Sequence, residues 1–258
     1  ENENDLAGAA EVGLSAVRSF DNFDAYVEAT FKFNTLDDGS SLESDGAVAG
    51  LKGDFGQIEA GDSDSVYEDL ITDSLDFFEQ ADLDKAKKDP DESSMLTYYS
   101  PSYGGFSFNL QAAIEDESDG VESTTRKAEE AFQASTAYDF GPGAIHLGYN
   151  DRGFNADSSD EVIGLAATFD VGSAAEVAIK HEMQTESGVD TDFTGIGLEV
   201  NYGMGDIYGA YQSVSPDGSA SDQSQYAVGI DAEIEDGLKI YAELANFDGL
   251  NSDDADEL

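Results

Sequence analysis

The sequence predicts an all-β fold, specifically a transmembrane antiparallel β-barrel. Three observations lead to this prediction. Segments of alternating polarity recur along the chain, short and long connections alternate between them, and the polar strand faces are rich in amide, hydroxyl and glycine residues. Strands of membrane barrels are about 10 residues long and alternate between lipid-facing and lumen-facing side chains. No stretch approaches the roughly 18 consecutive apolar residues of a membrane-spanning helix.

The alternation is clearest between residues 24 and 34, where Ala25, Val27 and Phe31 share one face while Tyr26 and Lys32 share the other. Successive side chains of a strand point to opposite faces, so such a segment forms a strand with one apolar face. About fourteen segments show this pattern: 7–17, 24–34, 47–53, 56–61, 94–100, 105–115, 131–139, 143–150, 162–170, 174–183, 193–202, 206–214, 223–235 and 237–247.

The connections follow a second rhythm, in which short turns and long acidic loops alternate. Outer-membrane barrels have brief turns at one end and long loops at the other, whereas Greek-key sandwiches do not keep this order. The many glycines suit a curved barrel wall. The short turns lie at 53–56, 100–104, 140–143, 170–173, 203–206 and 235–237. The long loops lie around 35–45, 62–93, 115–130, 151–161, 184–191, 214–222 and 248–258.

The charge is strongly negative, with 57 acidic against 11 basic residues and a net charge of −46. Self-repulsion of this size destabilises a compact fold at low ionic strength, and salt screens it. Disordered acidic chains contain few aromatic residues, so the 15 Phe and 12 Tyr argue against disorder. We therefore expect a folded protein of a salt-adapted organism, and nucleic acid is excluded as a partner because a polyanion repels it.

No pattern in the sequence indicates an enzyme. Without cysteine there is no thiol catalysis or thiolate metal site. His146 and His181 are isolated, and no nucleophile–base set, phosphate-binding loop or nucleotide fingerprint is present. We therefore expect no catalytic residue, no metal and no cofactor. Residues 1–5 lack the basic start and apolar core of a signal peptide, which predicts a mature or trimmed start.

A soluble fold is the alternative interpretation, since alternating strands also build an acidic β-sandwich. Such a protein would be a binding module or a glycan-acting enzyme from a halophile. It would place Phe31, Phe108 and Leu165 together in one core between two sheets, whereas a barrel points its apolar faces toward lipid.

Two hairpins resemble those of the Gram-negative general porin family. Residues 49–61 (AGLKGDFGQIEAG) are similar to the hairpin that precedes the family's long third loop. Residues 95–108 (MLTYYSPSYGGFSF) are similar to the next hairpin, with its aromatic strand, Ser-Pro turn and Gly-Phe-Ser-Phe strand. Both occur in the right order and flank an insertion of the right size. The resemblance continues more weakly over nearly the whole chain.

The resemblance implies a single domain over 1–258, a trimeric barrel of sixteen strands in the outer membrane of a Gram-negative bacterium. Its third loop, 62–93, would fold into the lumen as a constriction. The spacing of Val66, Leu70, Ile71, Leu75 and Phe78 predicts a short helix in this loop. Fourteen strands rather than sixteen, and an end in an apparent outer loop, favour missing terminal strands.

The implied function is passive diffusion of small hydrophilic solutes and ions, with a preference for cations. Loop carboxylates would face basic residues across the lumen and select ions by their charge. Lys32 and Lys52 take lumenal positions by strand parity, and Arg18 lies at a strand end. The expected constriction residues are Glu68, Asp69, Asp73, Asp76, Glu79, Arg18, Lys32 and Lys52.

Overall fold

One antiparallel sheet of fourteen strands makes up the fold, each strand pairing with the next in chain order. The computed structural model describes residues 9–34, 42–79, 81, 83, 86, 95–113, 131–151, 160–186, 188–218, 221–235 and 238–248. The strands are β1 (Ala9–Ser19), β2 (Phe23–Asn34), β3 (Leu42–Gly53), β4 (Gly56–Gly61), β5 (Met95–Tyr99), β6 (Phe106–Ala113), β7 (Phe132–Asp139), β8 (Gly143–Asp151), β9 (Glu161–Asp170), β10 (Ala175–Glu186), β11 (Val189–Asn201), β12 (Asp206–Pro216), β13 (Gln223–Glu235) and β14 (Leu238–Asp248).

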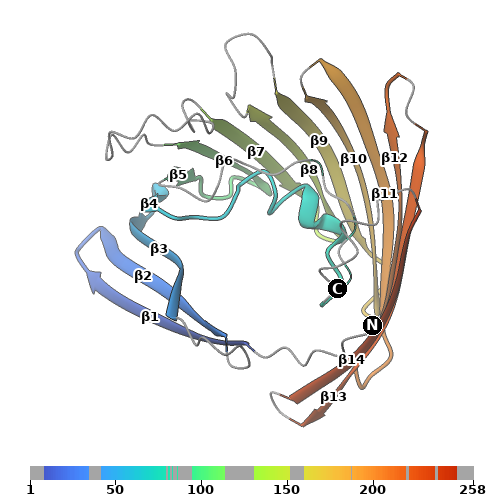
Figure 1. Cartoon of the computed structure of the whole chain (residues 1–258). Coiled ribbons are helices and arrows are strands. Elements are labelled where there is room, and N and C mark those ends of the chain that lie inside the picture. The colour runs from blue at the N-terminus through green and yellow to red at the C-terminus, as the bar shows by residue number, and fades with distance from the viewer. Residues whose placement is uncertain are drawn as a thin grey trace.

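The sheet curls into a barrel wall, as Figure 1 shows. Its outward face is apolar: Leu147, Leu165 and Ile196 remain 53%, 51% and 51% exposed. The predicted all-β barrel is therefore confirmed, and the sandwich interpretation is wrong because a single sheet leaves Leu165 without a second sheet to cover it. In the described residues no helix is long and apolar enough to cross a membrane.

One predicted connection is wrong. Instead of a long loop around 184–191, β10 and β11 continue to Glu186 and Val189, which pair with each other. Gly188 follows β10 with a φ of 77°, a left-handed conformation that favours glycine and suits a tight hairpin. The strict alternation of short and long connections therefore fails at this hairpin.

The two edges of the sheet belong to β1 and β14, and within the described residues no hydrogen bonds join these two strands. Figure 1 shows them on either side of an opening in the wall. Fourteen strands are thus confirmed, while sixteen remains a prediction. The loop expected at 248–258 lies almost wholly outside the described residues.

The connection between β4 and β5 lies on the concave side of the sheet. We call its described part, residues 62–79, 81, 83 and 86, the inner loop. It runs inside the curve of β5 to β10, with β1 to β3 on the opposite side of the lumen (Figure 1). The expected short helix is one 3-10 turn, Thr72–Leu75.

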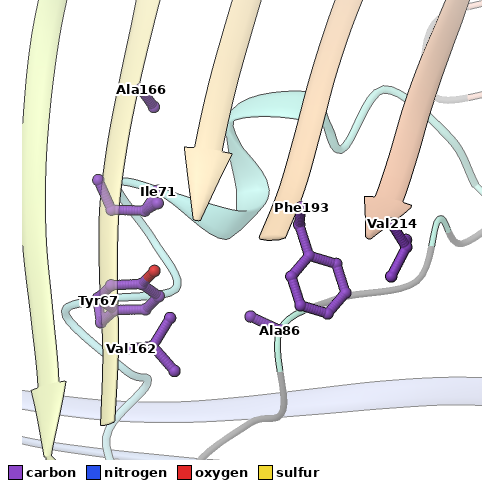
Figure 2. Packing of buried hydrophobic residues seen from close by; sticks show 7 residues of the cluster. All are labelled: Tyr67, Ile71, Ala86, Val162, Ala166, Phe193 and Val214. Carbon is purple, nitrogen blue, oxygen red and sulfur yellow. The ribbon is translucent and has the colours of Figure 1, made fainter. Parts of the chain in front are cut away.

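The buried apolar core lies between the inner loop and the inner surface of the wall. Tyr67 and Ile71 of the loop pack against Val162 and Ala166 of β9, as Figure 2 shows. A second cluster joins the last part of the loop to β12 and β13, through Ala81, Leu83, Ala210 and Ala227 with Phe78 beside them. The loop is therefore packed onto the wall rather than suspended in the lumen.

Candidate functional site

The first part of the inner loop is held by amide side chains of the wall. Gln133 of β7 accepts hydrogen bonds from the Ser65 hydroxyl at 2.7 Å and from the Tyr67 backbone N–H at 3.1 Å. Gln111 of β6 donates to the Asp64 carbonyl at 2.8 Å. Both amides are 1% exposed. They satisfy loop backbone groups that water would otherwise hydrate, without adding charge to the lumen.

A buried ion pair of β10 holds the middle of the loop. Lys180 Nζ lies 2.9 Å from Glu182 Oε2. Glu182 Oε1 accepts hydrogen bonds from the hydroxyls of Tyr67 and Thr72, each at 3.0 Å, and Lys180 donates to the Thr72 carbonyl at 3.3 Å. Removing one partner of such a pair leaves an uncompensated buried charge, which costs about 3–5 kcal/mol.

Glycines on the inner surface of the wall make room for the loop's apolar side chains. Gly148 of β8 and Gly164 of β9 are directly paired, and Tyr67 and Ile71 lie over both of them. A Cβ at Gly148 would come within 2.7 Å of each of these side chains. Leu75 and Phe77 occupy the corresponding spaces over Gly195 and Gly197 of β11. Because these four glycines have no Cβ atom, the loop can lie close to the wall along them, and we call the four residues the glycine track.

The far end of the described loop is anchored on β14. The carboxylate of Glu243 accepts the backbone N–H groups of Glu79 at 2.7 Å and Ala81 at 2.9 Å. Lys239 bridges Glu79 Oε1 at 2.9 Å and Asp231 Oδ2 at 3.1 Å. The loop is therefore fixed at its beginning, its middle and its far end.

Carboxylates gather where the loop faces the lumen. The pKa of Asp69 is raised to about 6, first by partial burial and then by the charges of Asp64, Asp73, Glu68 and Glu59. Although the side chain of Asp69 is exposed, protein surrounds its other sides and keeps the like charges close. This arrangement concentrates negative charge on the open side of the loop.

Glu59 of β4 extends this negative patch onto the wall. Its side chain is 7% exposed and accepts hydrogen bonds from Tyr26 at 2.6 Å, Gln57 at 2.9 Å and Tyr99 at 3.2 Å. Three donors from β2, β4 and β5 thus fix the carboxylate next to the loop.

The family comparison decides what kind of protein carries this arrangement. The family model described as Gram-negative porin matches residues 1–252. The chain belongs to the Gram-negative porin family. Two relatives, a monosaccharide porin of Halomonas sp. and a major outer membrane protein of Halomonas elongata, are each 25% identical over 297 residues, which cover 96% of this porin and 81% of the relative. The chain is thus a channel protein of the Gram-negative outer membrane, not an enzyme.

Solved structures agree on the fold. An anion-selective porin from Comamonas acidovorans superposes with a TM-score of 0.72 at 16% identity, over 93% of this porin and 79% of the other chain. A mutant of the Rh. blastica porin gives a TM-score of 0.75 at 12% identity, over 93% and 85% of the two chains. At these identities the likeness shows the barrel fold alone.

The expected basic residues do not form one patch in this porin. Lys32 and Lys52 both lie on the lumenal face, where Lys32 is 3.7 Å from Glu11 and Lys52 lies directly opposite Asp24 in the register of β2 and β3. Asp24 lies eight residues before Lys32 on β2, so the two lysines are separated by roughly 27 Å along the strand direction, at about 3.4 Å per residue.

The expectation for Arg18 is wrong. Arg18 pairs with Ala25, which shares the outward face of β2 with Val27. Directly paired residues point to the same side of a sheet, so Arg18 faces away from the lumen. Its guanidinium carbon lies 5.2 Å from the centre of the Phe20 ring, a cation–π contact at the short-turn end of the hairpin.

The five expected loop acids differ in their surroundings. Asp69 and Asp76 are exposed, and Glu68 and Asp73 are half-buried, all within the turn region after Val66. Glu79 is paired with Lys239, so this cation offsets its charge. The structure therefore brings Glu68, Asp69 and Asp73 into one acidic group with Asp64 and Glu59, two carboxylates that sequence reasoning did not single out.

Sequence reasoning also missed the anchors of the loop, for which one signal was present. Gly148, Gly164, Gly195 and Gly197 all occupy inward positions, on β8, β9 and β11, where other inward positions carry polar side chains. A row of missing side chains on one face indicates close approach of another segment. We attributed the glycines to curvature of the wall alone, and no comparable signal marked Lys180 or Glu182.

The glycine track gives a first prediction. Gly164→Val should disturb docking of the loop, because the new side chain would overlap Ile71 and Tyr67. Overpacking of this kind costs about 1–3 kcal/mol, and amide hydrogen exchange of residues 65–76 should rise. Gly13→Val is the matched control, since a Cβ at Gly13, also lumenal, meets nothing within 4 Å. Equal exchange in the two variants would contradict the docking role.

The raised pKa of Asp69 gives a pH prediction. At pH 7 this carboxyl is charged at a cost to the folded state, and the cost is relieved as pH falls through about 6 toward the unfolded value. Between pH 7 and 5 the docked loop should therefore become more protected in hydrogen exchange and lose one negative charge. Asp69→Asn should remove this step. A wild-type profile identical to that of the variant would refute the assignment.

Proposed function

We propose that this outer-membrane porin admits small hydrophilic solutes and ions and prefers cations. The observation that carries the proposal is the acidic group formed by Asp64, Glu68, Asp69 and Asp73 of the inner loop with the buried Glu59 of β4 beside them. Rings or patches of carboxylates raise the local concentration of cations and the energy of anions in a pore. The pKa of Asp69 is raised first by burial and then by the charges of these neighbours, so the carboxylates lie close enough to interact.

The inner loop is proposed as the constriction of a single barrel domain that spans the chain. It lies along β5 to β14, which leaves the passage between the loop and the β1–β3 side of the wall. Lysines 32 and 52 face this passage from the other side. Because they are far apart, we assign the ion preference to the acids, with Asp69 first, and only a local role to each lysine.

Small uncharged sugars are proposed among the solutes. A relative is named a monosaccharide porin, and it matches 96% of this chain.

A homotrimer in the outer membrane of a salt-adapted bacterium is part of the same proposal. The outward faces of β1 to β4 carry small residues around a shallow apolar groove of about 460 Å³, lined by Ala16, Ala29, Ala47, Ala49 and Ala60. Leu14 and Val27 also line this groove, beside the five alanines. Small residues let a second barrel wall approach closely, so we assign this face to other copies of the chain, and the mass of the protein in detergent tests it.

Reversal potentials test the ion preference. The folded protein in a planar bilayer under a gradient of potassium chloride should give a potential with the sign of cation flow. Liposome swelling in small sugars tests the neutral solutes separately. A potential of the opposite sign overturns the cation preference, and absence of both conductance and swelling overturns passage altogether.

A further inference from the structure

The inner loop meets one charged group of the wall that is out of contact with water. Glu182 is 0% and Lys180 4% exposed. Among the described ion pairs this is the one with both side chains buried: both partners of Lys32–Glu11 and Lys239–Glu79 are at least 44% exposed, and Lys239 is 49% exposed beside the buried Asp231. A buried ion pair adds little net stability, but breaking it is costly, so it favours the one arrangement of the chain in which both charges keep their partners.

The contacts of this pair reach across to two points of the loop. Glu182 Oε1 receives the hydroxyls of Tyr67 and Thr72, and Lys180 Nζ lies 3.3 Å from the Thr72 carbonyl. Tyr67 and Thr72 bracket the segment that carries Glu68 and Asp69. The pair thus fixes both ends of the stretch whose carboxylates face the lumen, while its own charges cancel.

We propose that Glu182, positioned by Lys180, is a latch that holds residues 67–72 against β10 and thereby sets the width and the charge of the passage. This inference rests on the proposed function of the inner loop as the constriction. Glu182 is a positioning residue, since it acts through the loop rather than on the solute. Gly148 and Gly164 of the glycine track let the loop lie close enough to the wall for the hydroxyls of Tyr67 and Thr72 to reach Glu182.

Two double variants separate the latch from the stability of the wall. Lys180→Met with Glu182→Leu replaces the pair by apolar groups of similar size, a change that buried ion pairs commonly tolerate, and removes the acceptor of Tyr67 and Thr72. Lys180→Met with Glu182→Gln also removes both charges but keeps a carbonyl oxygen for the two hydroxyls. The first double variant should release the loop and the second should retain it.

The loop side offers an independent approach. Tyr67→Phe combined with Thr72→Val removes the two donors and leaves the ion pair of the wall intact. Thr194→Val is the matched control, because it removes a 2.8 Å side-chain contact between Thr194 of β11 and His181 of β10, on the outward face. Retained heat-modifiable migration in detergent gels shows that each barrel is folded.

Single-channel conductance and hydrogen exchange of residues 65–76 are then measured for all variants. Released loops should raise conductance roughly twofold, since ion flux follows the open cross-section, and should increase exchange, while the Glu182→Gln double variant and Thr194→Val match the wild type. A folded Glu182→Leu double variant with wild-type conductance and exchange overturns the latch. If even the wild type fails to conduct, the proposed function fails, and exchange alone still decides whether the pair holds the loop.

Discussion

Replacing Glu68, Asp69, Asp73, Asp76 and Glu79 by their amides is expected to abolish most of the cation preference. The five substitutions remove negative charge that the inner loop presents to the lumen, and each amide has nearly the same size as the acid it replaces. Reversal potentials under a salt gradient should move toward zero, by tens of millivolts if the passage is strongly selective. Among the single variants Asp69→Asn should change the potential most, because Asp69 is exposed and lies among four other carboxylates.

A matched variant controls for the overall charge. Asp21, Asp54, Asp170, Asp217 and Asp222 are exposed acids in turns or at strand ends, outside the inner loop. Their conversion to Asn reduces the net negative charge by the same amount. If this control shifts the potential as far as the loop variant does, the preference arises from the general field of the protein, and the constriction assignment is wrong even though the barrel is correct.

Removal of salt is expected to destabilise the protein strongly. At a net charge of −46 the carboxylates repel one another, and the screening length grows from about 3 Å at 1 M to about 30 Å at 0.01 M salt. The temperature at which the folded band disappears in detergent gels should therefore fall steeply between about 2 M and about 10 mM salt. Divalent cations should protect at lower concentration than sodium, since carboxylate oxygens bind them.

A neutral osmolyte is the control for this experiment. Sucrose stabilises compact states through exclusion from the protein surface and does not screen charge. It should therefore fail to replace salt at the same osmolality. Equal melting temperatures in low and high salt, or full rescue by sucrose, would show that repulsion between the acids does not limit stability.

The wall of the barrel was predictable because the alternation of polar and apolar residues within each strand shows which of its faces points outward. Alternation along a strand depends only on neighbouring residues, so all fourteen strands and the inward faces of Lys32 and Lys52 followed from parity. The prediction for Arg18 failed because polarity does not distinguish the two faces at the end of β1. Ser15 and Val17 point inward there, whereas Ala16 and Arg18 point outward. The prediction of a loop around Gly188 failed because acidic residues in two paired strands have the composition of a loop.

The contacts of the inner loop were not predictable in the same way. They join residues whose separation in sequence is large, and nothing local in Tyr67 or Thr72 indicates a partner on β10. The helical spacing of Val66, Ile71 and Leu75 correctly predicted an apolar side of the loop. This side packs on the glycine track, and a 3-10 turn takes the place of the expected helix. The acidic group likewise arises only after folding, when Glu59 and Asp64 approach Asp69.

The anchoring of the inner loop has a consequence for the order of folding. Each strand of the wall pairs with its neighbour in the chain, so hairpins can form one after another at little cost in loop closure. The loop, by contrast, contacts Glu182 across 115 residues from Tyr67 and Glu243 across 164 residues from Glu79. Its docking sites do not exist until β10 and β14 are in place, so the outer wall assembles first and the passage takes its final shape last.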